Sequence, residues 1–197
     1  MSTKPILLLD LGGVVFTSTG VDSPAIDWTV ITELNNTYGH DLNVGADVFP
    51  DFMRDYNRAT GLQLAGGDFL REVFDTLAIN RELIDAARRV YDIVIVSDNY
   101  RENIAYIAER YRFADWARQQ IYSFDFGLTK EDPAFFRRLL AELDVDAPGE
   151  LLLLLDDSPE KLASAASVGI PGIRYQDNAG AIRALDKHAK TWINHGR

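Results

Sequence analysis

The chain has 197 residues, with 30 acidic and 20 basic side chains, a formal net charge of -10 and a hydrophobic fraction of 47%. This length and composition predict a globular chain with a sizeable core and room for one small inserted domain. The negative charge repels phosphate backbones and anionic lipid surfaces, so neither nucleic acid nor a membrane is an expected partner. Cysteine is absent, which excludes disulfides, thiolate nucleophiles and cysteine zinc sites.

The start of the sequence indicates where the protein is expected to reside. The apolar run that begins at Pro5 meets an acid at Asp10, which is too early for a signal peptide, and no apolar stretch is long enough to span a bilayer. We therefore expect a cytoplasmic protein. The sequence leaves its oligomeric state open.

Short apolar runs, rich in β-branched residues or ended by turn signals, predict five strands, at 6–11, 92–98, 120–124, 151–157 and 172–175. Helical patterns follow at 81–90, 101–111, 132–143, 159–168 and 179–194. Alternating strands and helices predict an α/β fold with a Rossmann-like, doubly wound parallel sheet whose strands are buried on both faces. We assign residues 1–16 and 81–197 to this core.

Residues 17–80 interrupt the alternation. Their pattern predicts about three amphipathic helices, separated by Gly, Pro and Asp signals, with no strand between them. Because this segment follows the first strand directly, it would stand above the carboxyl end of that strand, where open α/β sheets bind ligands. We interpret it as a small α-helical cap inserted into the core, acting as a lid.

Polar side chains follow three of the predicted strands. Asp10 ends the first strand, Ser97 ends the second, and Asp156 and Asp157 end the leucine-rich one, while Lys130 precedes a helix start nearby. In a parallel sheet these ends share one edge, so the side chains would converge. Three carboxylates in one partly buried place need a proton or a cation, and magnesium (Mg²⁺) is the hard ion that takes carboxylate oxygens and bridges to phosphate.

The arrangement resembles the haloacid dehalogenase (HAD) superfamily of hydrolases, most of whose members are magnesium-dependent phosphatases. "LLLDLGGVVF" is similar to the motif of the nucleophilic aspartate, "VIVSDN" to the motif of the phosphate-binding hydroxyl, "FDFGLTKEDPAFF" to the lysine motif, and "LLLLLDDSPEKLASAASVGI" to the acidic metal motif with its helix. The four motifs occur in the family's order over nearly the whole chain. The helical segment occupies the place of the family's cap.

This resemblance implies roles for individual residues. Asp10 would be the nucleophile that forms an aspartyl-phosphate. Magnesium would be held by Asp10, by the backbone carbonyl of Gly12 and by Asp157, with Asp156 as a further ligand or as a partner that steadies one. Ser97, Asn99 and Lys130 would bind the substrate, Ser97 and Lys130 through phosphoryl oxygens, and Asn99 would also steady the second loop. The implied substrate is a small phosphorylated metabolite, with a sugar phosphate as the class that other "DLGG" and "DLGN" openings suggest.

The motif departs from the family at Gly12. Phosphatases of the family usually carry a second aspartate there, which protonates the leaving group and then activates water. General acid–base catalysis contributes roughly 10²–10⁴ in rate, so its absence matters. Three explanations stay open: a leaving group that needs little protonation, a substitute residue or water, or a reaction other than phosphate hydrolysis.

Two alternatives from other classes also remain. A 2-haloacid dehalogenase needs neither the second acid nor a metal, but the Gly12–Gly13 pair differs from the typical opening of those enzymes and the paired acids 156–157 suit a cation. A catalytically weak member would instead bind a phosphorylated ligand or a protein.

Each candidate residue also has a purely structural interpretation. Asp10 alone could be a turn residue, the acids 156–157 could favour a helix N-terminus, Ser97 could cap the next helix, and Lys130 could be an ordinary solvated lysine. The four motifs together favour a site.

Overall fold

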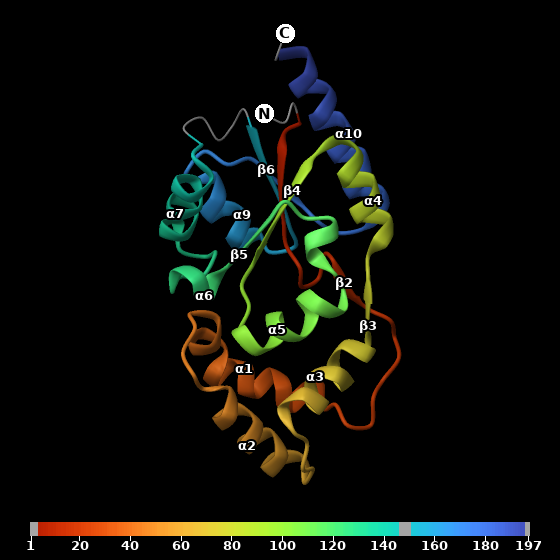
Figure 1. Cartoon of the computed structure of the whole chain (residues 1–197), viewed down its shortest axis with the longest axis vertical. Coiled ribbons are helices and arrows are strands. Elements are labelled where there is room, and N and C mark those ends of the chain that lie inside the picture. Colours follow the sequence, from red (N-terminus) through yellow and green to blue (C-terminus); the bar gives the residue numbers. More distant parts are fainter. Residues whose placement is uncertain (1–3, 146–150, 196–197) are drawn as a thin grey trace.

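The structure is a computed structural model that describes residues 4–145 and 151–195 (Figure 1). Its centre is a five-stranded sheet in the order β5-β4-β1-β6-β7. The strands are β1 (Ile6–Leu9), β4 (Asp92–Ser97), β5 (Gln119–Tyr122), β6 (Leu152–Asp156) and β7 (Gly172–Arg174). All neighbouring strands pair in parallel, and Leu8 of the central strand lies opposite Val94 and Leu154. The predicted α/β fold with a parallel sheet is confirmed.

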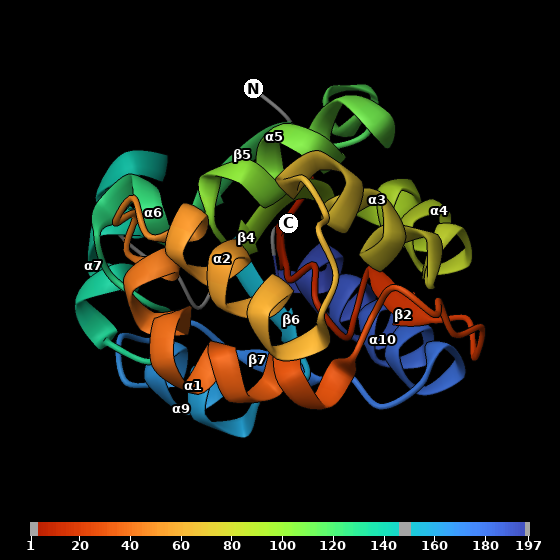
Figure 2. The ribbon, with the colours of Figure 1, turned by 90° about the horizontal axis from the view of Figure 1, so that it is seen from below.

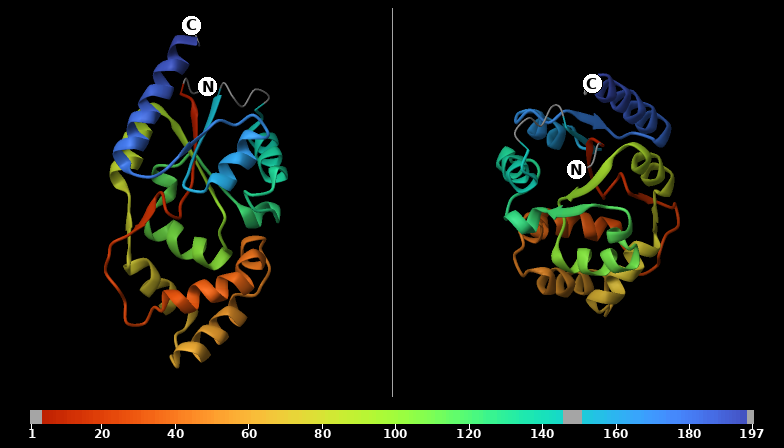
Figure 3. Two further views of the ribbon diagram at one scale, coloured as in Figure 1. Left: turned by 180° about the vertical axis from the view of Figure 1, so that it is seen from behind. Right: turned by 45° about the horizontal axis from the view of Figure 1, so that its top comes forward.

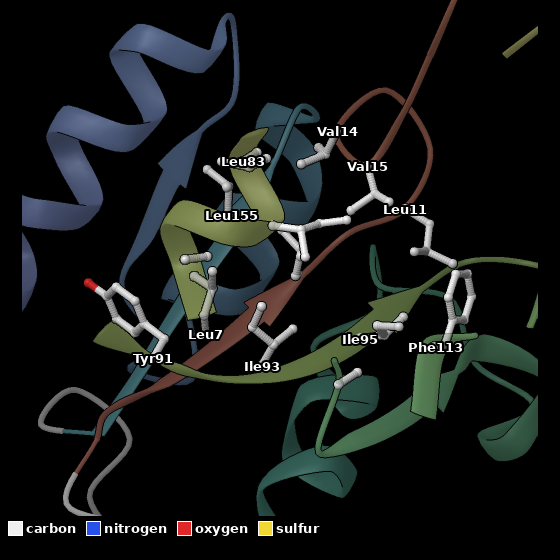
Figure 4. Packing of buried hydrophobic residues seen from close by; sticks show 14 of the residues in the cluster. Leu7, Leu11, Val14, Val15, Leu83, Tyr91, Ile93, Ile95, Phe113 and Leu155 are labelled. Atoms are coloured by element: carbon white, nitrogen blue, oxygen red, sulfur yellow. The ribbon is translucent and has the colours of Figure 1, made fainter. Parts of the chain in front are cut away.

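Alternate residues of the sheet enter two separate hydrophobic cores. Leu7, Ile93 and Leu155 face the core formed with α4 (Arg81–Val90), α5 (Arg101–Arg110) and α10 (Asn178–His195), as Figure 4 shows. The intervening residues of the same strands face α7 (Pro133–Leu143) and α9 (Pro159–Ala166). Seen from behind, α10 runs beside α4 on one side of the sheet while α7 and α9 lie on the other (Figure 3). The sheet is therefore doubly wound, and its strands are apolar throughout because both faces are buried.

The predicted strand at 120–124 is wrong in its second half. The strand β5 ends at Tyr122, and residues 123–126 form the short helix α6 (Ser123–Phe126). The carboxylate of Asp125 accepts a hydrogen bond from the backbone N–H of Tyr122 at 2.9 Å, and Gly127 ends the turn with φ 66°. This local cap outweighs the strand preference of the aromatic residues.

The segment 17–80 contains three helices, α1 (Trp28–Asn43), α2 (Phe49–Thr60) and α3 (Gly66–Asp75). As predicted, no strand lies between these helices, within residues 28–75 that the structure describes throughout, but the prediction missed the short strands at the two ends of the segment. Two short strands, β2 (Phe16–Ser18) and β3 (Leu77–Ile79), pair antiparallel at the two ends of the segment. They bring the chain that leaves the sheet beside the chain that returns to it, so the helices are attached through a two-stranded ribbon.

The three helices share a hydrophobic core of their own. Phe52, Tyr56 and Phe69 pack there edge to face, with ring centroids 4.9 to 5.7 Å apart. The hydroxyl of Tyr56 donates to the carbonyl of Ala25 and accepts from the N–H of Asp27, which satisfies this buried polar group. Tyr100, from the loop after β4, stacks on Phe49 and joins this core to the sheet.

Seen from below, α1 and α2 lie in front of the ends of β4 and β6 (Figure 2). The helices thus stand at the carboxyl edge of the sheet, where the chain leaves each parallel strand. The remaining element is a short 3-10 helix, η1 (Phe113–Asp115), before β5. Across residues 4–145 and 151–195, none of the helices combines the length and the apolar character that crossing a bilayer requires.

Candidate active site

Asp10 follows the last residue of the central strand and is 3% exposed. Its backbone N–H donates to the carbonyl of Leu155 at 3.1 Å, which continues the pairing of β1 with β6 for one more residue. The chain then turns, and the backbone N–H groups of Val15 and Phe16 both donate hydrogen bonds to the carbonyl of Leu11. Asp10 is therefore held rigidly at the carboxyl edge of the sheet, as its position in the sequence predicts.

Lys130 is completely buried and its ammonium lies among oxygen atoms. Its Nζ is 2.7 Å from Oδ1 of Asp10 and 2.6 Å from Oδ2 of Asp156, and it donates to the carbonyl of Val96 at 3.1 Å. An ammonium has three N–H donors, so these three acceptors satisfy it. Lys130 thus links the ends of three neighbouring strands, β1, β4 and β6. Of the two carboxylate oxygens of Asp10, it contacts Oδ1 and not Oδ2.

The two consecutive acids 156 and 157 are placed very differently. Asp156 is fully buried, and its second oxygen accepts the backbone N–H of Ser158 at 2.9 Å, so both of its carboxylate oxygens have partners. Asp157 is exposed. One carboxylate oxygen from each of Asp10, Asp156 and Asp157 lies within 4.8 Å of the others, an arrangement that could hold a metal ion. Asp157 is the acid of the pair that is open to such an ion.

The two glycines after Leu11 have opposite surroundings. A Cβ on Gly12 would meet no atom within 4 Å, whereas a Cβ on Gly13 would come 2.3 Å from Oδ2 of Asp157. Gly13 also has φ 71°, in the left-handed region that disfavours side chains. The site thus requires a glycine at position 13. At position 12, by contrast, there is room for a side chain.

Ser97 and Asn99 lie in the loop that leaves β4. Ser97 is 2% exposed, and its hydroxyl makes a long contact of 3.4 Å with the carbonyl of Asp98, so it is available to a stronger acceptor. Asn99 has a structural place: its side-chain oxygen accepts from Tyr100 and Asn103, and its backbone exchanges hydrogen bonds with the hydroxyl of Ser123. These hydrogen bonds hold Asn99 within the loop, and its expected role in substrate binding stays a prediction.

Sequence reasoning missed Asp98 and Lys161. Oδ1 of Asp98 accepts the backbone N–H of Lys130 at 2.8 Å, and Oδ2 lies 3.1 Å from Nζ of Lys161, in the first turn of α9. The carboxylate of Asp98 thus links the loop after β4 to the loop that carries Lys130 and to α9. A signal was present in the sequence, because a cation in the first turn of a helix opposes the helix dipole and calls for a compensating partner.

The charges at this edge affect one another strongly. Burial raises the pKa of Asp10 above its ordinary value, the ammonium of Lys130 opposes this rise, and the carboxylate of Asp156 adds to it. Burial alone would lower the pKa of Lys161, but the carboxylates of Asp10, Asp98 and Asp156 outweigh it and raise that pKa well above the usual range. The acids outnumber the ammonium groups here, so an added cation would favour the ionised form of Asp10.

A cavity of about 490 Å³ opens beside these charges. Its walls come from α1, from the loop after β4 and the start of α5, from the loop that carries Lys130, and from α9. The lining is mostly polar: Asn35, Gly39, His40, Leu42, Asn43, Asp98, Asn99, Tyr100, Asn103, Thr129, Glu131 and Lys161. Asp98 and Lys161 belong both to the cavity wall and to the charged cluster, so the cavity adjoins the acids and faces the helical segment.

The residues fit a magnesium ion. The three carboxylates exceed the one buried ammonium that pairs with them, and hard oxygen ligands are those that magnesium prefers. A side chain at Gly13 would fill the space that the carboxylate of Asp157 occupies. The predicted residues Asp10, Ser97, Lys130, Asp156 and Asp157 thus all lie at the same edge of the sheet, next to Gly12.

No protein-family model matches this sequence, and no curated protein matches it by sequence. Solved structures do resemble it. A predicted HAD-like family hydrolase from Porphyromonas gingivalis is 21% identical, with a TM-score of 0.71 over 95% of this chain and 98% of that one. A HAD family enzyme from Bacteroides thetaiotaomicron, solved in complex with magnesium and inorganic phosphate, is 16% identical, with a TM-score of 0.66 over 88% and 94% of the two chains.

A 2-haloacid dehalogenase from Pseudomonas syringae is also similar in fold, at 15% identity and a TM-score of 0.54 over 87% of this chain and 86% of that one. At such low identities the likeness shows the fold. The resemblance drawn from the four motifs is confirmed at this level: the chain has the HAD fold.

Proposed function

We propose that this chain, built on the HAD hydrolase fold, is a magnesium-dependent phosphomonoester hydrolase in which Asp10 is the nucleophile. The observation that carries the proposal is the surroundings of the Asp10 carboxylate. Lys130 binds Oδ1, and carboxylate oxygens of Asp10, Asp156 and Asp157 lie within 4.8 Å of one another. Magnesium in complex with phosphate in the Bacteroides thetaiotaomicron enzyme supports the choice of ion and ligand.

The first step would use Oδ2 of Asp10, the oxygen that Lys130 does not hold. It would attack phosphorus in line, forming an oxygen–phosphorus bond while the bond to the ester oxygen breaks and its electron pair stays on that oxygen. The ester oxygen then takes a proton from water. Lys130 keeps the carboxylate oriented through Oδ1, and the hydroxyl of Ser97 would donate to a phosphoryl oxygen.

In the second step, water would attack the phosphorus of the aspartyl-phosphate while the bond from phosphorus to Oδ2 breaks and its electron pair returns to the carboxylate of Asp10. Inorganic phosphate is released, and the proton that the attacking water loses neutralises the hydroxide left when water protonated the ester oxygen. Bound magnesium would supply positive charge beside the phosphoryl oxygens throughout. Asp157, which is exposed, and Asp10 are the side chains open to this ion, and the carbonyl of Gly12 would complete the protein ligands. Asp156 would orient the others through Lys130 and the N–H of Ser158.

The substrate we propose is a small phosphorylated metabolite, with sugar phosphates as the class that the cavity suits. The lining offers carboxamides, hydroxyls and an imidazole in about 490 Å³, and such groups donate and accept hydrogen bonds as a polyol does. The helices α1–α3 would act as a cap, since α1 forms one wall of this cavity.

The test uses a panel of phosphate esters and a short haloacid, each with magnesium or with chelator. We expect phosphate release that chelator abolishes and that Asp10→Asn lowers on the order of 10⁴-fold. Asp47→Asn, which changes an exposed acid of the helical segment, is the control and should match the wild type. Halide release without magnesium would overturn the proposal in favour of a dehalogenase. Tight binding of phosphate without turnover would favour a binding protein.

A further inference from the structure

Lys161 lies near the acids of the site, although no role was predicted for it from the sequence. It comes from the first turn of α9, its side chain is 20% exposed, and its ion pair is with Asp98, at 3.1 Å. Asp98 in turn is anchored by the backbone N–H of Lys130. The ammonium is therefore fixed in place although it is not enclosed, which distinguishes it from an ordinary solvated lysine.

The two lysines of this region face different parts of the site. Lys130 is fully buried, spends its donors on three protein oxygens and is absent from the cavity lining. Lys161 lines the cavity, and Asp98 takes only part of the hydrogen-bonding capacity of its ammonium. Its charge also acts on Asp10. Lys161 thus belongs to the wall of the cavity and also acts electrostatically on the nucleophile.

The acids around Lys161 stabilise its charge at the cavity wall, because the carboxylates of Asp10, Asp98 and Asp156 outweigh the effect of burial. A cation in the first turn of a helix is disfavoured by the helix dipole, and burial disfavours it further. Asp98 compensates the charge while leaving the ammonium at the cavity wall. A purely structural partner for Asp98 would not need to line the cavity.

We propose that Lys161 is a catalytic residue on the leaving-group side, whose ammonium lies beside the bridging oxygen of the phosphate ester and stabilises the charge that develops there. This inference rests on the proposed phosphatase function. It assigns to Lys161 part of the help that a side chain at Gly12 would give to the leaving group.

The step transfers no proton from Lys161. When the bond between phosphorus and the bridging oxygen breaks, the electron pair stays on that oxygen, the ammonium lies next to the resulting charge, and water then protonates the oxygen. Electrostatic help of this kind grows with the charge that the leaving oxygen carries. Esters of strongly basic alcohols therefore depend on it most, and acyl phosphates depend on it least.

The test measures kcat/KM along a series of rising leaving-group basicity: acetyl phosphate, para-nitrophenyl phosphate, phenyl phosphate and a sugar phosphate of a primary alcohol. Lys161→Met keeps most of the length of the side chain and removes its charged ammonium. We expect a loss of less than about 3-fold on acetyl phosphate that grows to about 100-fold on the primary ester. Lys161→Arg keeps the cation and should restore much of the loss on the basic leaving groups.

Two further variants separate this role from a structural one. Lys161→Met combined with Asp98→Asn removes both charges, so that no carboxylate is left unpaired, and the dependence on the leaving group should persist. Lys187→Met, which changes an exposed lysine on α10, should match the wild type on every ester. An equal loss on all four esters in the single and double variants would overturn the proposal and make Lys161 structural.

A binding measurement supplies a readout without turnover. In the Asp10→Asn background, where the ester is not cleaved, calorimetry should show that Lys161→Met changes binding of the sugar phosphate by less than about 3-fold, because the bridging oxygen gains its charge only as the bond breaks. A loss of ester binding as large as the loss of kcat/KM would contradict a role in the transition state and would make Lys161 a residue that binds the uncleaved ester. If the wild type hydrolyses none of the four substrates, the phosphatase function fails and not the assignment of Lys161 alone.

Discussion

The carboxylate of Asp157 occupies the space into which a side chain at position 13 would project. A Cβ on Gly13 would come 2.3 Å from Oδ2 and 2.9 Å from Cγ of Asp157, and Gly13 has φ 71°. The turn that follows β1 and the acid that follows β6 thus have complementary shapes. The absence of a side chain at Gly13 lets Asp157 approach Asp10.

Gly13→Ala should displace Asp157 and weaken magnesium binding by about 10-fold or more. The positive φ should also lower the free energy of unfolding by about 1–3 kcal/mol. Calorimetric titration with magnesium and urea unfolding in chelator measure the two effects. Gly12→Ala is the matched control, because a Cβ there meets no atom within 4 Å. Equal effects at the two neighbouring glycines would contradict this assignment.

Gly12→Asp should be accepted by the fold, since the space around Gly12 is open and its backbone is not in the left-handed region. We expect kcat/KM to rise for esters with basic leaving groups and to change little for acetyl phosphate, because a new acid helps only where protonation is slow. The measurement is the same ester series as for Lys161. A uniform loss with unchanged unfolding would show that the new carboxylate disturbs the metal site instead.

Lys130→Met should strongly destabilise the protein. It leaves the buried carboxylates of Asp10 and Asp156 facing each other without their shared ammonium, and breaking a buried pair in this way costs about 3–5 kcal/mol. Urea unfolding in chelator measures the cost. Adding Asp156→Asn removes one of the unpaired charges and should recover part of it. A double variant as unstable as the single one, or worse, would speak against the charge as the cause.

Asn35→Leu should lower kcat/KM for sugar phosphates by about 3- to 10-fold, the loss expected for one hydrogen bond, while acetyl phosphate, which is too small to fill the cavity, should be unaffected. Asn36→Leu is the matched control, since Asn36 is the next residue on α1, is also exposed and does not line the cavity. Identical behaviour of the two variants would remove α1 from the substrate site.

The contact between Tyr91 and His188 predicts a dependence of stability on pH. The hydroxyl of Tyr91 donates to the carbonyl of Leu185 and lies 3.0 Å from Nδ1 of His188, and burial lowers the pKa of His188 below its ordinary value. The unfolded chain therefore binds more protons near and below the ordinary pKa of histidine. The contribution of His188 is fully present above that pKa and is lost as the pH falls through it toward the lower folded-state pKa.

His188→Asn keeps a donor for Tyr91 and removes the titrating ring. Urea unfolding at pH 7.5 and pH 5.5, values of about one unit to either side of the ordinary pKa, should show a smaller acid destabilisation in this variant than in the wild type. Parallel decreases in the two proteins would mean that other groups carry the acid sensitivity.

The sequence by itself determined the five strands, their alternation with helices and the acids and lysine that gather at one edge. These features are local: apolar runs buried on both faces form parallel strands, and the carboxyl ends of parallel strands meet at one edge. Asp10, Ser97 and Asp156 could therefore be placed together by their positions alone. The helix at 123–126 could not, because it depends on the hydrogen bond that Asp125 offers to Tyr122.

Only the tertiary structure decided which member of each similar pair carries which role. Asp156 and Asp157 look alike in the sequence, but one is buried against Lys130 and the other is exposed. The adjacent glycines 12 and 13 differ only because Asp157 approaches one of them. The pairing of Asp98 with Lys161 likewise joins a strand end to a helix far along the chain, and such a contact follows from how the elements pack, not from local pattern.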